Sequence, residues 1–145
     1  MAADRALGHY THEKNPFSCL AAITTLEIIY DEGLVENAQK VGKYALECLQ
    51  ELKQRHPIVG DVRGLGLVLG IDLVANPETK EPATEFADRV LYGCLSRGLS
   101  FKTTMGSVIT LTPPLTVTVE EIDRAIAILD EVITTVGQED ETDAG

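Results

Sequence analysis

Apolar residues recur along the chain with two different spacings, and each spacing is typical of one kind of secondary structure. Over residues 16–30, 34–55, 84–97 and 119–136 they recur every three or four positions, as on one face of a helix. Residues 59–74 are apolar at alternate positions, as in a strand with one buried face, and the short segments 99–103 and 108–112 are predicted to form further strands. This order of elements predicts an α+β fold, with a small, mainly antiparallel sheet covered on one side by helices.

Capping residues mark where several of these helices begin and end. Asn15 can cap the first helix, and Pro16 fits its first turn, where a missing N–H group costs nothing. Gly98 follows the third predicted helix and favours a helix C-terminus. Thr118 and Glu121 have the spacing of a capping box. We therefore expect helix boundaries at these residues.

The first predicted helix differs from the others because it is apolar around much of its circumference. Its apolar residues leave few polar positions for a side that faces water. Such a helix needs cover on more than one side. We therefore predict a long interdomain helix that packs against something beyond the small domain itself.

Residues 59–74 are predicted to form one strand with two unlike faces. One face would carry large apolar side chains and cover helices, namely Leu65, Leu67, Leu69, Ile71 and Leu73. The other face would carry mostly glycines, which let another backbone or element approach closely.

Composition and charge exclude several classes of function. The chain has 145 residues, which suits one domain, and its net charge of −11 would repel a nucleic-acid backbone. No segment approaches the roughly 20 apolar residues of a membrane span, and the first residues lack the apolar core of a secretory signal. We expect a cytoplasmic protein that binds neither membranes nor nucleic acid. Residues 137–145 are expected to form an acidic, disordered tail.

Two short motifs resemble known sites but lack the context that those sites need. The segment GLGLVLG has the spacing GxGxxxG inside a predicted strand, whereas a dinucleotide loop lies between a strand and a helix. The segment HEKNP lacks the second histidine of a zinc-binding helix, so we expect no metal site. Without a recognisable catalytic centre, the residues alone are compatible with an independent domain that binds a ligand or a protein.

Three separated segments together resemble one enzyme family. They are GHYTHEKNP at residues 8–16, DVRGLGLVLGIDL at 61–73 and VITLTPPLTVTVEEIDRAIAILD at 108–130. In this order they resemble the C-terminal part of the class III aminotransferases, pyridoxal-phosphate enzymes of fold type I. The resemblance implies a cofactor-contacting loop at residues 1–14, the aminotransferase C-terminal domain at 15–136, and the tail after it.

The resemblance assigns a cofactor-binding role to Thr11. A family threonine, followed by three residues and then Asn-Pro, reaches across the dimer interface and binds the cofactor's phosphate in the other subunit. Thr11, Asn15 and Pro16 match this pattern, and a hydroxyl is a good hydrogen-bond donor to phosphate. The resemblance therefore implies pyridoxal 5'-phosphate as cofactor and a homodimer partner. The alternative is that Thr11 only stabilises the turn before Asn15.

The resemblance also points to Thr110 as a substrate-binding position, and here the chain departs from the family. Several members carry an arginine three residues before the first proline of the Pro-Pro pair, and it binds a substrate carboxylate. Here that residue is Thr110. A hydroxyl cannot make the charged, bidentate contact of a guanidinium. We therefore expect the amino donor to be an amine, or an amino acid that is anchored differently.

The residues that perform the chemistry in this family do not occur in the chain. The family's large domain supplies the lysine that holds the cofactor, and none of the six lysines here stands in that motif. The resemblance implies that the chain closes the substrate cleft beside its own large domain, while an amino group passes from a small-molecule donor to a keto acid. We assign no catalytic residue and expect the isolated chain to be inactive.

Overall fold

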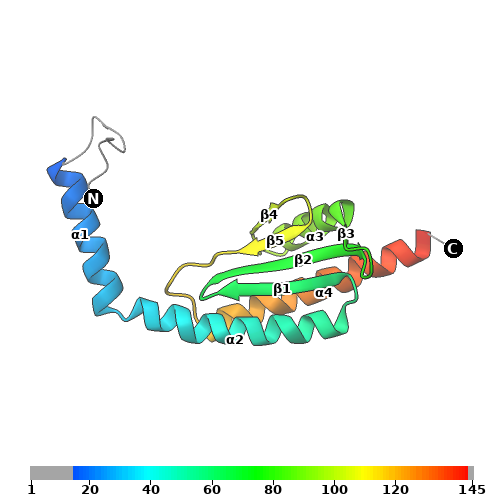
Figure 1. Ribbon diagram of the computed structural model, residues 1–145, viewed down its shortest axis with the longest axis horizontal. Helices are drawn as coiled ribbons and strands as arrows, with labels where there is room; N and C mark the ends of the chain where they lie inside the picture. Colours follow the sequence, from blue (N-terminus) through cyan, green and yellow to red (C-terminus); the bar gives the residue numbers. More distant parts are fainter. Residues whose placement is uncertain (1–14, 144–145) are drawn as a thin grey trace, which may run out of the picture. The chain divides into compact units, whose positions relative to one another are not determined.

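The computed structural model describes residues 15–143, which belong to two compact units with a boundary between Leu34 and Val35. The first unit contains helix α1 (Pro16–Asp31), drawn in blue in Figure 1. The backbone N–H of Phe17 donates to Asn15 Oδ1 at 3.0 Å, which confirms the predicted cap. Taken by itself, α1 buries none of its side chains. The described part of this unit therefore has no core of its own.

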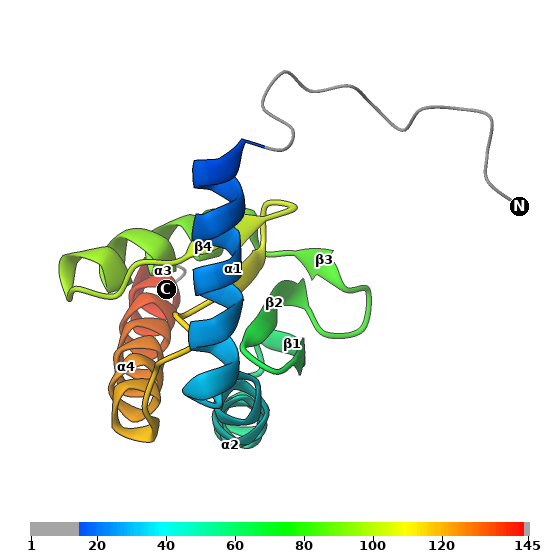
Figure 2. The same ribbon diagram turned by 90° about the vertical axis from the view of Figure 1, so that its left-hand side faces the viewer.

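The second unit is a small antiparallel sheet with three helices over one of its faces (Figures 1 and 2). Its elements are α2 (Leu34–Arg55), β1 (Val59–Leu65), β2 (Val68–Asn76), β3 (Glu81–Pro82), α3 (Thr84–Ser96), β4 (Lys102–Thr104), β5 (Val108–Leu111) and α4 (Val119–Asp143). The strands pair in the order β1-β2-β5-β4, and the short β3 pairs with β2 outside this path. This arrangement confirms the predicted α+β fold.

The core of the second unit lies between the sheet and the three helices. Removing these apolar side chains from water is the main source of the unit's stability. Strands β2 and β5 contribute every second residue to it, and α2, α3 and α4 each contribute one face. The largest fully buried side chains are Leu49, Leu52, Leu69, Ile71, Leu73, Val90, Cys94, Ile109, Leu129, Val132 and Ile133.

The segment predicted as one strand is in fact a hairpin, and this corrects the predicted faces. Strand β1 ends at Leu65 and β2 begins at Val68, with Gly66 at a φ of 54° in the turn between them. Leu65 lies opposite Val68 on the uncovered face and is 88% exposed, whereas Leu67 is buried. The alternation restarts after the reversal, so the prediction was right for Leu69 but wrong for Leu65.

Helix α4 continues through Asp143, past the point where a disordered tail was expected. Arg89 on α3 binds this part of α4: its Nη2 donates to Glu139 Oε2 at 2.8 Å, and its Nη1 donates to Asp140. The positive charge of Arg89 offsets the repulsion between the neighbouring carboxylates of Glu139 and Asp140. Among residues 15–143, no helix is long and apolar enough to span a membrane.

Polar contacts join α4 to α2. The Tyr44 hydroxyl donates to Asp123 Oδ1 at 2.6 Å, and the Asp130 carboxylate binds both His56 Nε2 at 2.5 Å and the guanidinium of Arg55. The first turn of α4 is closed by the predicted capping box, because the Thr118 N–H donates to Glu121 Oε2 at 2.9 Å. These contacts hold α4 against α2 on the covered side of the sheet.

Candidate functional site

Thr110 lies in a row of four residues that crosses all four main strands. Lys102 of β4 pairs with Thr110 of β5, Thr110 pairs with Gly70 of β2, and Gly70 pairs with Arg63 of β1. Directly opposed residues of antiparallel strands share a face. The neighbours Ile71 and Ile109 are buried against the helices, so this row lies on the uncovered face of the sheet. We call these four residues the open-face row.

Two hydroxyl groups meet at the β5 position of the row. Thr104 Oγ1 lies 3.1 Å from Thr110 Oγ1, and either atom can be the donor. Thr104 follows Lys102 by two residues on the same strand, so both side chains extend from one face of β4. The Thr110 hydroxyl is therefore held beside a strand that carries a lysine.

The two cations of the row have different surroundings. Arg63 Nη1 donates to Asp61 Oδ2 at 3.0 Å and lies 3.6 Å from Asp72 Oδ2. The Arg63 hydrogen bond lowers the pKa of the Asp61 carboxyl below its usual value. Within the described part of the chain, by contrast, no carboxylate oxygen lies within 4.0 Å of the Lys102 ammonium. The β4 end of the row therefore carries an uncompensated positive charge.

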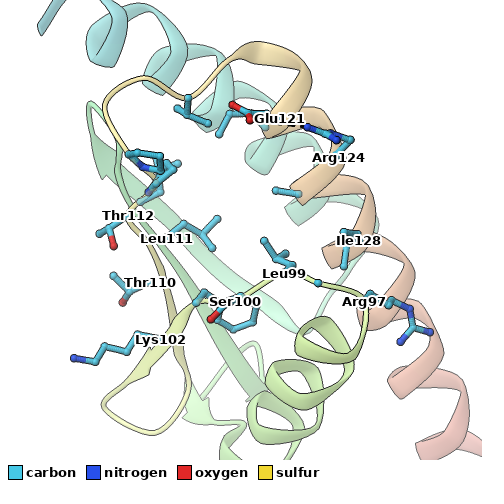
Figure 3. A pocket seen from close by; sticks show the side chains of 18 residues that line it. Arg97, Leu99, Ser100, Lys102, Thr110, Leu111, Thr112, Glu121, Arg124 and Ile128 are labelled. Carbon is cyan, nitrogen blue, oxygen red and sulfur yellow. Dashed lines mark ion pairs between the residues drawn. The ribbon is translucent and has the colours of Figure 1, made fainter. Parts of the chain in front are cut away.

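A separate hollow of about 890 Å³ lies between β4, β5 and α4. Leu99, Leu111 and Ile128 point into it, as Figure 3 shows, and Arg97, Glu121 and Arg124 stand along its helical side. Lys102 and Thr110 also border this hollow, but their side chains project from the other side of the strands (Figure 3). The apolar hollow and the polar row therefore open on different sides of the sheet edge.

The structure places one of the two predicted site residues. Thr110 stands in the open-face row, whereas Thr11 lies outside the described residues. Lys102 was not predicted as a site residue, although it lies in the predicted strand segment LSFKT. Its pairing with Thr110 depends on the turn between β4 and β5, where Met105 and Gly106 have φ values of 53° and 85°. Residue types alone did not reveal that register.

The chain matches a known protein family over most of its length. The sequence model of the family "Aminotransferase class-III" matches residues 5–133. A (R)-1-hydroxy-2-aminoethylphosphonate ammonia-lyase from Vibrio splendidus is 44% identical over 135 residues, which are 93% of this chain and 28% of the relative. An isoleucine 2-epimerase from Lentilactobacillus buchneri is 40% identical over 127 residues, 88% of this chain and 28% of the relative. The chain thus spans less than a third of the length of these relatives.

A solved structure agrees with this family assignment. The amine transaminase of an uncultivated Pseudomonas species, described in its PLP-bound form, is 34% identical and superposes with a TM-score of 0.83. The superposition covers 90% of this chain and 30% of the transaminase. Pyridoxal phosphate is therefore the cofactor of enzymes of this kind. The chain belongs to the class III aminotransferase family and has the fold of its C-terminal domain.

Proposed function

We propose that the chain is the substrate-closing domain of a cytoplasmic, homodimeric, pyridoxal-phosphate-dependent aminotransferase. In this reaction an amino group passes from an amine or amino acid to a keto acid, which leaves a carbonyl compound and a new amino acid. The observation that carries the proposal is the superposition on an amine transaminase over nearly the whole chain. An independent binding domain is less favoured, because the family match spans both described units.

The cofactor would be held partly by Thr11. Its hydroxyl and adjacent backbone N–H groups have the donor chemistry that a phosphate needs, and we propose that they serve the active site of the partner subunit. When bound, pyridoxal phosphate withdraws electrons from the carbon that bears the amino group. In this proposal, Thr11 orients the cofactor without taking part in bond breaking.

The amino donor would carry an acidic group. The compounds named for the two relatives, an aminoethylphosphonate and isoleucine, both combine an amine with an acid. An acid at one end lets an enzyme hold the donor while the amine reaches the reaction centre. This supports a donor of the same general type here.

A lyase and an epimerase are the second candidates, because the two relatives bear these names. The reactions differ in their products. An aminotransferase makes a new amino acid from the keto acid, a lyase releases ammonia, and an epimerase changes only the configuration of its substrate.

The full-length enzyme, which includes the large domain, tests the proposal. It is incubated with pyridoxal phosphate, pyruvate and an acidic amine, and alanine and ammonia are measured separately. We expect alanine in equal amount to the donor consumed. Ammonia without alanine, or only an inverted amino acid, would exclude the aminotransferase. The isolated chain serves as the control and should form none of these products.

A further inference from the structure

We infer that Asn37, in the first turns of α2, is a positioning residue for the amino donor. Its side-chain amide holds residues 112–118, the loop that connects β5 to α4, and thereby steadies the end of β5. Asn37 does not touch the donor itself but acts through Thr110 on that strand. The inference rests on the proposed function and on the substrate-binding role that the family resemblance gives Thr110.

A single amide group of Asn37 binds two carbonyl oxygens of the loop. Asn37 Nδ2 donates to the carbonyl oxygen of Leu115 at 2.7 Å and to that of Val117 at 3.1 Å. An amide nitrogen carries two hydrogens, so it can make both hydrogen bonds at once. Because the two carbonyl groups lie two positions apart, binding both of them fixes the course of the chain between them. Asn37 is half-buried, so water competes less for these hydrogen bonds.

The loop benefits from an outside donor because two of its residues have no backbone N–H group. Pro113 and Pro114 cannot donate hydrogen bonds, and their rings restrict the backbone to extended conformations. Within the loop, the Val117 N–H donates to the carbonyl oxygen of Pro114 at 3.0 Å. Asn37 adds two hydrogen bonds from a helix that lies 78 and 80 positions away in the sequence. The position of the loop therefore depends on α2.

Thr110 stands where the pairing of β5 with its neighbours ends. Thr110 is the last residue of β5 that pairs with β4, and Leu111 is the last that pairs with β2. The two side chains point to opposite sides of the strand, with Leu111 directed into the hollow beside α4 (Figure 3). A strand end frays unless the chain after it is held. The contacts of Asn37 with the following loop thus keep the Thr110 hydroxyl in place on the uncovered face.

Gln50 offers a matched control because it makes the same kind of contact from the same helix. Gln50 Nε2 donates to the carbonyl oxygen of Val62 on β1 at 3.0 Å. Strand β2 lies between β1 and β5, so this contact is remote from the end of β5. Loss of the Gln50 hydrogen bond should destabilise the second unit, as loss of the Asn37 hydrogen bonds does, without moving Thr110.

Steady-state kinetics of the full-length holoenzyme tests the inference, with pyruvate and the better donor of β-alanine and 2-aminoethanesulfonate. Asn37→Leu should raise the KM of the donor about 3- to 10-fold, because the hydrogen bonds that hold the end of β5 are lost. Its kcat should change less than about twofold, since binding shared by the ground state and the transition state affects KM alone. Gln50→Leu should change neither constant more than about twofold. Equal KM values for the two variants would overturn the inference.

A double-mutant cycle tests whether Asn37 acts through Thr110. Thr110→Val removes the hydroxyl and should itself raise the KM of the donor. In the Thr110→Val protein, Asn37→Leu should raise KM less than about twofold further, because the group that Asn37 positions is already gone. Full additivity of the two effects would show that Asn37 acts elsewhere. If Asn37→Leu does not fold, Asn37→Asp takes its place, because it keeps the shape of the side chain but cannot donate when ionised.

Binding of the donor without turnover separates the inference from the proposed function. β-Alanine and 2-aminoethanesulfonate are titrated into the holoenzyme by calorimetry in the absence of pyruvate. Weaker binding to Asn37→Leu than to Gln50→Leu supports the inference even if no alanine is formed, in which case the proposed aminotransferase reaction alone fails. Formation of alanine with an unchanged donor KM in Asn37→Leu refutes the inference and leaves the proposed function standing.

Discussion

A Cβ atom on Gly42 would lie 2.1 Å from the carbonyl oxygen of Gly66, so α2 approaches the β1–β2 turn as closely as its backbone allows. Gly66 itself has a φ of 54°, in the region that favours glycine. Two glycines therefore permit the close approach of the second helix to the hairpin turn. The hydrogen bond from Gln50 Nε2 to the carbonyl oxygen of Val62, at 3.0 Å, is a further contact between this helix and the hairpin.

Gly42→Ala should lower the free energy of unfolding by about 1–3 kcal/mol, because the added methyl group must displace backbone. Urea unfolding followed by circular dichroism measures the change. Gly137→Ala is the matched control on α4, where a Cβ atom meets nothing within 4 Å. It should stabilise the protein by about 0.5–1 kcal/mol through helix propensity. Equal effects of the two substitutions would mean that the turn moves aside without cost.

Asp130→Asn should destabilise the second unit and weaken its acid sensitivity. Burial alone would raise the pKa of this carboxyl, but hydrogen bonds from His56 and Arg55 outweigh it and lower the pKa. The stability that these hydrogen bonds give the folded unit is therefore fully present above the unfolded pKa of about 4. It is lost as the pH falls through the lower pKa of the folded protein. We expect a loss of about 1 kcal/mol at neutral pH. Unfolding curves between pH 7 and pH 3 should converge for the two proteins at the acid end.

Cys94 should resist thiol reagents until the unit unfolds. Burial raises the pKa of its thiol to about 11, so little thiolate forms in the folded protein at neutral or mildly alkaline pH. Since the pKa of this thiol is higher in the folded than in the unfolded protein, its contribution to folding stability is fully present below the unfolded pKa. That contribution is lost as the pH rises towards 11. Labelling with a maleimide, followed by peptide mass spectrometry, should find Cys94 unmodified in buffer and modified in urea. Rapid labelling in buffer would show that the core opens locally.

Thr11→Ala in the full-length enzyme should weaken pyridoxal phosphate by about one to two orders of magnitude, because a hydrogen bond to a charged group is worth roughly 1.5–3 kcal/mol. Thr11→Ser should keep most of the affinity. The cofactor affinity is measured by fluorescence titration of the apoenzyme. An alanine variant with unchanged affinity would leave Thr11 as a turn residue only.

Mixed dimers test whether Thr11 acts across the interface. One subunit lacks the cofactor-binding lysine of the large domain, and the other carries Thr11→Ala. If Thr11 serves the partner's site, one site carries both lesions and the other carries neither, so activity survives at the intact site. If Thr11 serves its own subunit, each site carries one lesion and activity falls much further.

Features set by neighbouring residues were predictable from the sequence. The Asn15 cap and the Thr118–Glu121 capping box depend on hydrogen bonds over two or three positions, and the structure shows both. The hairpin at Gly66 was missed, because the leucine–glycine alternation continues through the turn while the chain reverses. A period of two describes a strand equally well on either side of such a reversal.

The candidate site required information that local patterns do not hold. The neighbourhood of Lys102 and Thr110 is fixed by strand register, and Gly70 joins them from a segment some forty positions earlier in the chain. The acidic composition of residues 137–145 suggested a disordered tail. In the structure, Arg89 on α3 binds Glu139 and Asp140 near the end of α4, and the sequence pattern does not show this contact. Long-range pairing decided these features, and composition could not reveal them.

The polar contacts that join α2 to α4 also determine when the second unit can fold during synthesis. Tyr44 and Asp123 are 79 positions apart, and His56 and Asp130 are 74 apart, so these contacts form only after nearly the whole unit has been made. Until α4 leaves the ribosome, the apolar faces of α2 and the sheet lack the side chains of Leu129, Val132 and Ile133 that cover them. Contacts between residues so far apart in the sequence slow folding, and they prolong the exposure of aggregation-prone apolar surfaces. A nascent chain stalled before α4 should therefore be a substrate for chaperones.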